Sequence, residues 1–305
     1  MNSDCLITEG ALVERLKSEF SLDMDPHVNH AGLIYEHPEI LGKLYRQYIE
    51  SARKHNLPIM LMTPTRRLNF ETLRKSRFSD RNIIADSCIY LKEIRNEYPD
   101  FGANIFIGGL LGSKGDAFRA DEALDTSEAY EFHKIQVAGF QAEKVDFLFA
   151  GIMPVLSEAI GMARAMAESG IPYMISFSIR KNGCLLDGTS IAKAIRIIDQ
   201  EVSPRPISYL SNCVHPLNLQ EALKNPVNSN SPQLSRFMGI QANASSLSPE
   251  ELNNCGILHQ ENFDGMIDRM IDLKKTSGIK MLGGCCGTDD VFIEKLAERL
   301  ALNNT

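Results

Sequence analysis

Short apolar runs recur eight times along the 305 residues of this chain, each followed by a stretch with helical periodicity. Such runs are typical of parallel strands that are buried on both faces. This alternation constrains the fold more than any other feature of the sequence. The runs are residues 5–8, 58–63, 104–109, 146–150, 173–178, 207–211, 237–241 and 279–283.

Amphipathic stretches between these runs predict helices, and several carry boundary signals. Asp125 and Ser248 each begin a sequence typical of a helix N-cap. Gly170 and Gly278 each follow a helical pattern, where glycine is a common stop. The predicted helices are residues 11–20, 40–55, 79–98, 127–142, 156–169, 190–199, 217–224, 262–276 and 289–302.

Eight strands, each followed by at least one helix, predict a single-domain α/β fold over residues 1–305, a (β/α)8 TIM barrel. A doubly wound open sheet is the alternative, and strand counting does not exclude it. The irregular stretches 110–126, 180–189 and 243–261 follow strands directly, whereas 225–235 is separated from its strand by a helix. Barrel enzymes elaborate this rim, which favours the barrel.

Composition excludes several classes of protein. The net charge is −7 and no basic cluster has interleaved aromatics, so we expect no nucleic-acid partner. No apolar run approaches the roughly 18 residues of a membrane span. The first residues do not resemble a secretory signal, and seven cysteines is an odd number at modest density. We therefore expect a cytoplasmic protein with reduced thiols and no membrane association.

Three cysteines are candidate metal ligands. Cys285 and Cys286 are adjacent in residues 283–288 (GGCCGT), and Cys213 lies in residues 211–216 (SNCVHP). Three thiolates can hold zinc and leave its fourth tetrahedral position open. Both segments follow predicted strands and would open onto the same rim of a barrel. Cysteine is also common as a small buried hydrophobe, so the chemistry alone leaves both interpretations open.

These two cysteine segments resemble the zinc-binding motifs of the homocysteine S-methyltransferase family. That family includes betaine- and S-methylmethionine-dependent enzymes and the homocysteine domain of cobalamin-dependent methionine synthase. Residues 9–11 (EGA), 132–154 and 176–189 are also similar to family segments. The family fold is a (β/α)8 barrel, in agreement with the strand count.

The resemblance implies that Cys213, Cys285 and Cys286 bind Zn2+. Homocysteine or a related thiol would become a zinc thiolate that attacks the methyl group of a small-molecule donor, without a separate protein nucleophile. The expected partners are thus a thiol acceptor and a methyl donor, the expected process is methionine biosynthesis, and an oligomer is left open. Further candidate substrate-binding residues are Glu9, Gly10, Thr63 and Asn243.

The chain departs from the family pattern at several positions. Gly151 stands where the family usually has a glutamate that binds the amino group of homocysteine, and Glu9 stands where an aspartate is expected. The end of the second strand adds Arg66 and Arg67, which either meet an anionic substrate or are ordinary rim charges. Two alternatives therefore remain: an acceptor other than homocysteine, and a catalytically silent barrel that binds zinc or a thiol.

Two other features have competing interpretations. His215 either reaches the metal or acts as a base, or it caps the following helix; we favour the cap. Residues 108–112 (GGLLG) are rich in glycine but lack the full dinucleotide or P-loop pattern, which predicts a turn at the end of a strand.

Overall fold

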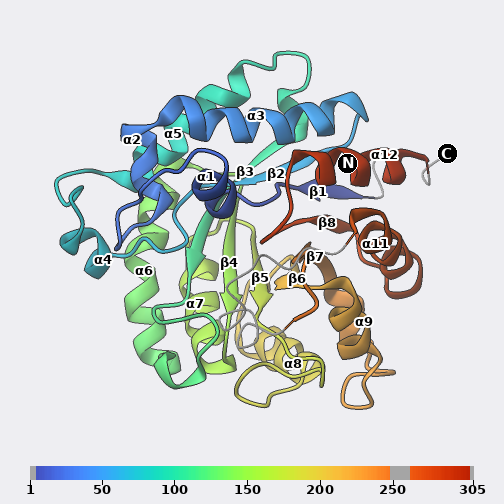
Figure 1. The fold of residues 1–305 in the computed structure, drawn as a ribbon. Helices are drawn as coiled ribbons and strands as arrows, with labels where there is room; N and C mark the ends of the chain where they lie inside the picture. The colour runs from blue at the N-terminus through green and yellow to red at the C-terminus, as the bar shows by residue number, and fades with distance from the viewer. Residues whose placement is uncertain (1–4, 248–261, 303–305) are drawn as a thin grey trace.

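The computed structural model describes residues 5–247 and 262–302. Eight parallel strands form a closed barrel in sequence order (Figure 1). Ile7 pairs with Ile59 on one side and with Leu282 on the other, which closes the sheet. The predicted barrel is confirmed and the open sheet is excluded. The strands are β1 (Leu6–Thr8), β2 (Ile59–Met62), β3 (Ile105–Gly112), β4 (Phe147–Met153), β5 (Tyr173–Phe177), β6 (Ser208–Val214), β7 (Phe237–Ala242) and β8 (Met281–Gly284).

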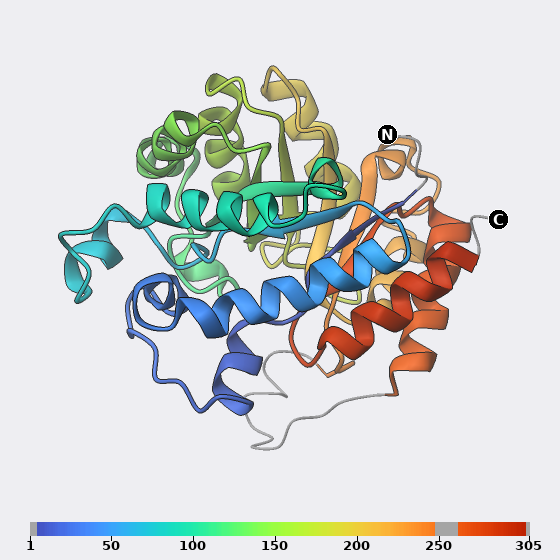
Figure 2. The same cartoon turned by 90° about the horizontal axis from the view of Figure 1, so that it is seen from above.

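Helices surround the barrel on the outside, as Figures 1 and 2 show. Two of them, α2 and α4, lie in segments for which the sequence predicted no helix. None of the helices in the described parts of the chain is both long and apolar enough to cross a membrane. The helices are α1 (Val13–Ser18), α2 (Leu33–Glu36), α3 (Pro38–Lys54), α4 (Phe70–Lys75), α5 (Ile83–Asn96), α6 (Thr126–Glu143), α7 (Leu156–Glu168), α8 (Ile191–Glu201), α9 (Pro216–Lys224), α11 (Phe263–Ser277) and α12 (Asp290–Leu302).

Alternation along each strand divides the core into two parts. Met60 and Met62 of β2 belong to the smaller cluster inside the barrel, together with the rings of Phe147 and Phe149 of β4. The intervening side chains, such as Leu148, face outward and join the larger cluster between strands and helices. Because both faces are buried, the strands have nearly continuous apolar sequences. Their positions could therefore be predicted well from the sequence.

Local capping explains where several helices begin and end. The side chain of Asp125 accepts hydrogen bonds from the backbone N–H groups of Ser127 and Glu128, as predicted for the start of α6. Gly278 has a φ of 69° and ends α11 in the left-handed conformation. The predicted cap at Ser248 lies outside the described residues.

Gly108 and Gly109 lie inside β3, so the prediction of a turn at the end of the strand is wrong. A Cβ at Gly108 would come within 2.4 Å of the Phe147 ring, and one at Gly109 within 2.7 Å of the Phe140 ring. Glycine is therefore required here because aromatic rings from inside and outside the barrel approach the strand. β3 continues to Gly112, three residues beyond its predicted end.

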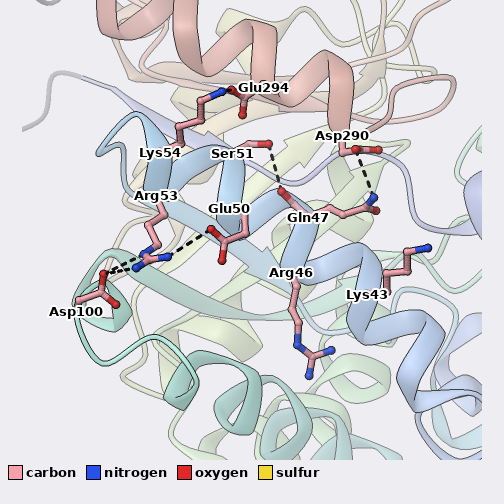
Figure 3. A pocket seen from close by; sticks show the side chains of 10 residues that line it. All are labelled: Lys43, Arg46, Gln47, Glu50, Ser51, Arg53, Lys54, Asp100, Asp290 and Glu294. Carbon is pink, nitrogen blue, oxygen red and sulfur yellow. Dashed lines mark hydrogen bonds and ion pairs between the residues drawn. The ribbon is translucent and has the colours of Figure 1, made fainter.

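The first and last long helices meet where the barrel closes. α3 and α12 lie side by side in both views (Figures 1 and 2). Lys54 pairs with Glu294 across this contact, and Gln47 donates a hydrogen bond to Asp290 over 3.4 Å (Figure 3). A surface pocket of about 950 Å³ runs along this seam, lined by charged side chains.

Candidate active site

The three candidate cysteines converge at the carboxyl ends of β6 and β8. The Cys213 Sγ lies 3.5 Å from the Cys286 Sγ, and the two sulfurs of the adjacent cysteines are 4.0 Å apart. All three sulfurs lie within 4.8 Å of one another. The predicted convergence of Cys213 with Cys285 and Cys286 is therefore present in the fold.

The loop after β8 is fastened to the end of β7 by backbone hydrogen bonds. The N–H of Cys285 donates to the carbonyl of Ala242 over 2.7 Å, and the carbonyl of Cys286 accepts from the N–H of Ala244 over 2.9 Å. These bonds continue the strand pairing past β8. The two adjacent cysteines are thus positioned by the barrel itself.

Glycine is required beside the cysteine pair because the backbone passes very close to β1. A Cβ at Gly283 would lie 1.9 Å from the Thr8 Oγ1 and 2.8 Å from the Thr8 carbonyl oxygen. Gly287 has a φ of 76°, in the left-handed region that side chains rarely adopt. The glycines therefore allow the turn that brings both sulfurs to the same side.

Cys213 itself has a positive φ of 61°, which is uncommon for a residue other than glycine. Such a conformation costs on the order of 1–3 kcal/mol and persists only where the surroundings enforce it. It occurs at a break in the β6–β7 register between Asn212 and Val214. The irregularity places the sulfur of Cys213 toward the other two cysteines.

Hydrogen bonds between the cysteines shift the pKa of Cys213 in one direction and the pKa values of the other two in the opposite direction. The thiols of Cys285 and Cys286, and more weakly the Asn243 amide, hold the pKa of Cys213 well below its usual range. The same bonds to Cys213 raise the pKa of Cys285 and of Cys286. The Asn243 Nδ2 donates to the Cys213 Sγ over 3.4 Å. The cluster therefore favours one thiolate, at Cys213, stabilised by two neighbouring thiols.

A pocket of about 260 Å³ opens directly above the cysteines. Its walls come from the ends of many strands, and most of them are apolar. Besides the three cysteines, the pocket is lined by Glu9, Gly10, Ala11, Leu12, Val13, Glu14, His30, Met62, Arg66, Leu110, Phe118, Ile152, Asn212, Gln241 and Gly284.

Glu9 and Gly10 line this pocket, where the sequence placed candidate substrate-binding residues. Glu9 is 7% exposed, and its Oε2 accepts a hydrogen bond from the Met62 N–H over 2.9 Å. Burial raises the pKa of Glu9 to about 8, although that hydrogen bond opposes the shift. At neutral pH the Glu9 carboxyl is therefore largely protonated.

Thr63 and Asn243 are less directly placed. The hydroxyl of Thr63 is buried, lies 2.7 Å from the Thr65 hydroxyl and accepts from the Leu110 N–H, and Thr63 does not line the pocket. Asn243 contacts the sulfur of Cys213, and its side-chain oxygen accepts from the Ser245 N–H. Asn243 thus supports a candidate ligand.

The wall formed by β4 carries no acidic side chain at position 151. A Cβ at Gly151 would lie 2.9 Å from the Leu110 Cδ1, so the Leu110 side chain fills the adjacent space. Ile152 follows with a φ of 59° and lines the pocket with its apolar side chain. This part of the pocket is therefore hydrophobic.

Arg66 lines the pocket, whereas Arg67 is exposed and does not. His30, whose position the sequence analysis missed, also lines it; the residue lies in a 310 turn between α1 and α2 and carried no sequence signal. Burial and the nearby charge of Arg66 lower the pKa of His30 to about 3. The imidazole is therefore neutral at physiological pH.

A second pocket of about 550 Å³ adjoins the first at Cys213, Asn212 and Phe118. Lys181 and His215 are among its lining residues. The His215 Nδ1 accepts a hydrogen bond from the Leu217 N–H over 3.2 Å, which confirms the predicted cap of α9.

The cysteine cluster fits a tetrahedral metal ion. Four ligands about 2.3 Å from zinc lie roughly 3.8 Å from one another. The two measured sulfur separations, 3.5 and 4.0 Å, bracket this value. All three cysteines line the pocket, so an exogenous ligand that enters it can reach the cluster.

Comparison with known proteins agrees with these features. The model of the family described as homocysteine S-methyltransferase matches residues 6–300. The homocysteine S-methyltransferase YbgG of Bacillus subtilis is 24% identical over 96% of this chain and 93% of its own length. Betaine–homocysteine S-methyltransferase 1 of Bos taurus is 21% identical over 98% of this chain and 73% of its own length.

Solved structures show the same fold. The metallated form of the homocysteine methyltransferase MmuM from Escherichia coli superposes with a TM-score of 0.78 at 17% identity, covering 98% of this chain and 97% of that chain. The oxidised form of the same protein gives a TM-score of 0.77. With the family model spanning nearly the whole chain, this protein belongs to the homocysteine S-methyltransferase family and is an S-methyltransferase.

Proposed function

We propose that this protein is a zinc-dependent thiol S-methyltransferase whose metal is held by Cys213, Cys285 and Cys286. The observation that carries the proposal is the cluster of three sulfurs within 4.8 Å at the floor of a pocket, in a chain of this family. Zinc bound there would lower the pKa of an incoming thiol, which is otherwise near 8.5, so that the thiol would react as a thiolate.

The protein's own residues would hold and shield the reacting groups. Cysteine ligands give the site high electron density, and the apolar walls from Met62, Leu110 and Ile152 exclude water from the substrate sulfur. The sulfur would attack the methyl carbon as the bond from that carbon to its leaving group breaks. The electron pair leaves with that group, so a sulfonium or quaternary ammonium donor departs as a neutral molecule.

The two pockets that meet at Cys213 offer separate places for the two substrates. The smaller one contacts all three cysteines and suits the thiol acceptor. The larger one is lined by Cys213 but, in the described part of the chain, by neither Cys285 nor Cys286, and suits the methyl donor. Acceptor and donor could then approach one another in line, as a direct displacement requires.

The acceptor is homocysteine or a related thiol. A non-homocysteine acceptor is favoured by one observation: position 151 has no acidic side chain, and Leu110 fills the space beside it. A catalytically silent barrel would bind metal and thiol without turnover.

Two measurements test the proposal. Metal analysis of the purified, reduced protein should give about one zinc per chain. A methyl-transfer assay over several thiols, with sulfonium, quaternary ammonium and methylated folate or cobalamin donors, should then give a methylated thiol. Absence of bound zinc would reject the metal site, and bound zinc without turnover on any donor would favour the silent barrel.

A further inference from the structure

Arg66 places a positive charge in the wall of the cysteine pocket. Its side chain is half-buried and follows β2. Among the residues that the structure describes, no carboxylate forms an ion pair or hydrogen bond with the Arg66 guanidinium. A partly desolvated guanidinium normally has such a partner, because five N–H donors leave the bulk solvent with it.

The two carboxyl groups of the same pocket already have hydrogen-bond partners. Glu9 accepts from the Met62 N–H, and the Glu14 Oε2 accepts from the Gly287 N–H. Arg66, unlike these two carboxyl groups, has no hydrogen-bond partner for its guanidinium in the described part of the chain, so its N–H donors are available to a ligand.

His30 adds a second polar group without a partner. It is 6% exposed and lines the pocket, and its Nδ1 has no hydrogen-bond partner among the residues that the structure describes. Arg66 is close enough to influence the titration of His30. A neutral imidazole that lines the same pocket as a guanidinium is a suitable second donor for an anion.

The two carboxyl groups that line the pocket are already engaged by backbone N–H groups, and much of the rest of the described lining is apolar. Leu110, Phe118 and Ile152 line it with apolar side chains, and no acidic side chain stands at position 151. The volume of about 260 Å³ is below the range of drug-sized sites, so the ligand is a small molecule.

We propose that the thiol acceptor carries a carboxylate that binds to Arg66, with His30 as a second donor, and that an amino group on the acceptor contributes little to binding. This inference rests on the proposed thiol methyltransferase function. It assigns the acceptor to the class of small mercaptocarboxylates, whether or not they bear an amino group.

The test uses the full-length protein loaded with Co2+ in place of zinc, whose absorption changes when a thiolate coordinates. Three thiols of similar length are titrated: homocysteine, 4-mercaptobutanoate, which lacks the amino group, and 3-aminopropane-1-thiol, which lacks the carboxylate. We expect 4-mercaptobutanoate to bind within about threefold of homocysteine, and 3-aminopropane-1-thiol to bind at least ~10-fold more weakly.

Variants at the two neighbouring arginines supply the control. Arg66→Gln should weaken 4-mercaptobutanoate at least ~10-fold, to the level of the aminothiol, and leave the aminothiol unchanged. Arg66→Lys should retain part of the preference, because it keeps the charge without the bidentate fork. Arg67→Gln, at the exposed neighbour, should bind all three thiols as the wild type does. Circular dichroism checks that each variant is folded.

Two outcomes overturn the inference: equal binding of the aminothiol and 4-mercaptobutanoate, or no change in this preference on Arg66→Gln. If Co2+ binds but no thiol perturbs its spectrum, the proposed function fails and takes this inference with it. The two failures are distinguishable, since the first leaves thiol coordination intact.

Discussion

Two pockets of this molecule, the seam pocket and the cysteine pocket, differ in whether their charged side chains form ion pairs with one another. The seam pocket between α3 and α12 is the larger, at about 950 Å³ against about 260 Å³ for the cysteine pocket. Its charges pair with one another on the surface: Arg53 with Asp100 at 2.8 Å, and Lys54 with Glu294 (Figure 3). In the cysteine pocket, Arg66 and His30 have no such partners among the described side chains.

The contrast teaches that size is a poor guide to function here. The charged side chains of the seam pocket form ion pairs and remain in contact with water, so a ligand would gain little free energy by binding to them. The cysteine pocket instead combines three converging thiols, a buried carboxyl group and a guanidinium that has no carboxylate partner among the described residues, an arrangement that costs folding free energy. Polar and titratable groups that lack partners cluster at binding and catalytic sites, where a bound ligand supplies the missing interactions.

The largest expected effect is at the proposed metal ligands. Cys286→Ser should weaken zinc binding by at least ~100-fold, because the serine oxygen is a poor substitute for a thiolate. Metal analysis should fall from about one zinc per chain to a small fraction, and methyl transfer should be lost with it. Cys184→Ser, outside the cluster, should retain the metal. Full zinc occupancy in Cys286→Ser would contradict the assigned ligands.

The next effect concerns Glu9 and pH. Burial raises its pKa from 4.5 to about 8, so between these values the unfolded chain has released a proton that the folded protein retains. The stability that the neutral carboxyl contributes is complete below about pH 4.5 and declines as pH rises to 8, by up to ~1.4 kcal/mol per pH unit.

Glu9→Gln should remove this slope, as measured by denaturant unfolding of metal-free protein at several pH values. Glu50→Gln, at an exposed carboxylate of the seam pocket, serves as the control and should keep the wild-type slope. An unchanged slope in Glu9→Gln would mean that Glu9 is ionised in the folded protein.

A smaller effect on the free energy of unfolding is expected where alanine replaces a glycine, and it depends on how closely other atoms surround that glycine. Gly283→Ala places a Cβ 1.9 Å from the Thr8 Oγ1 and should cost about 1–3 kcal/mol of unfolding free energy. Gly265→Ala in α11 meets no atom within 4 Å and should stabilise by up to ~1 kcal/mol. Denaturant unfolding compares the two, and equal effects would mean that the loop after β8 relaxes freely.

The smallest effect is expected in the seam pocket. Arg46→Gln removes a surface ion pair to Glu97, and both side chains are more than a third exposed. The free energy of unfolding should change by at most ~1 kcal/mol. Zinc content and thiol binding should equal those of the wild type. A loss of either would show that the seam pocket is coupled to the cysteine site.

Much of the fold could be predicted from local pattern. The eight apolar runs overlap the eight strands, because strands buried on both faces need continuous apolar sequence. Errors occurred at strand ends: β3, β4 and β6 each extend three residues past their predicted limits. Those extensions depend on hydrogen bonds to neighbouring strands. The neighbouring strands are remote in sequence, so a short stretch of sequence does not reveal where the pairing ends.

The cysteines were accessible to the sequence because their chemistry is rare and their motifs distinctive. The pocket around them was not. His30 lies in a turn without any motif, and Leu110 reaches Gly151 from an adjacent strand. Thr63 was predicted at the site, yet its hydroxyl lies next to that of Thr65. Which polar groups keep a free donor depends on their neighbours in space.

The sequence by itself predicted the barrel from the order of its apolar runs, and its cysteine motifs, through their resemblance to a family, pointed to the three metal ligands that we propose. Only the tertiary structure decided that Glu9 is buried and largely protonated, that Arg66 lacks a carboxylate partner among the described residues, and that the seam pocket holds ion pairs between its own side chains. The reason is physical. Desolvation and ion pairing depend on distances between residues remote in sequence, and these distances exist only once the barrel has closed.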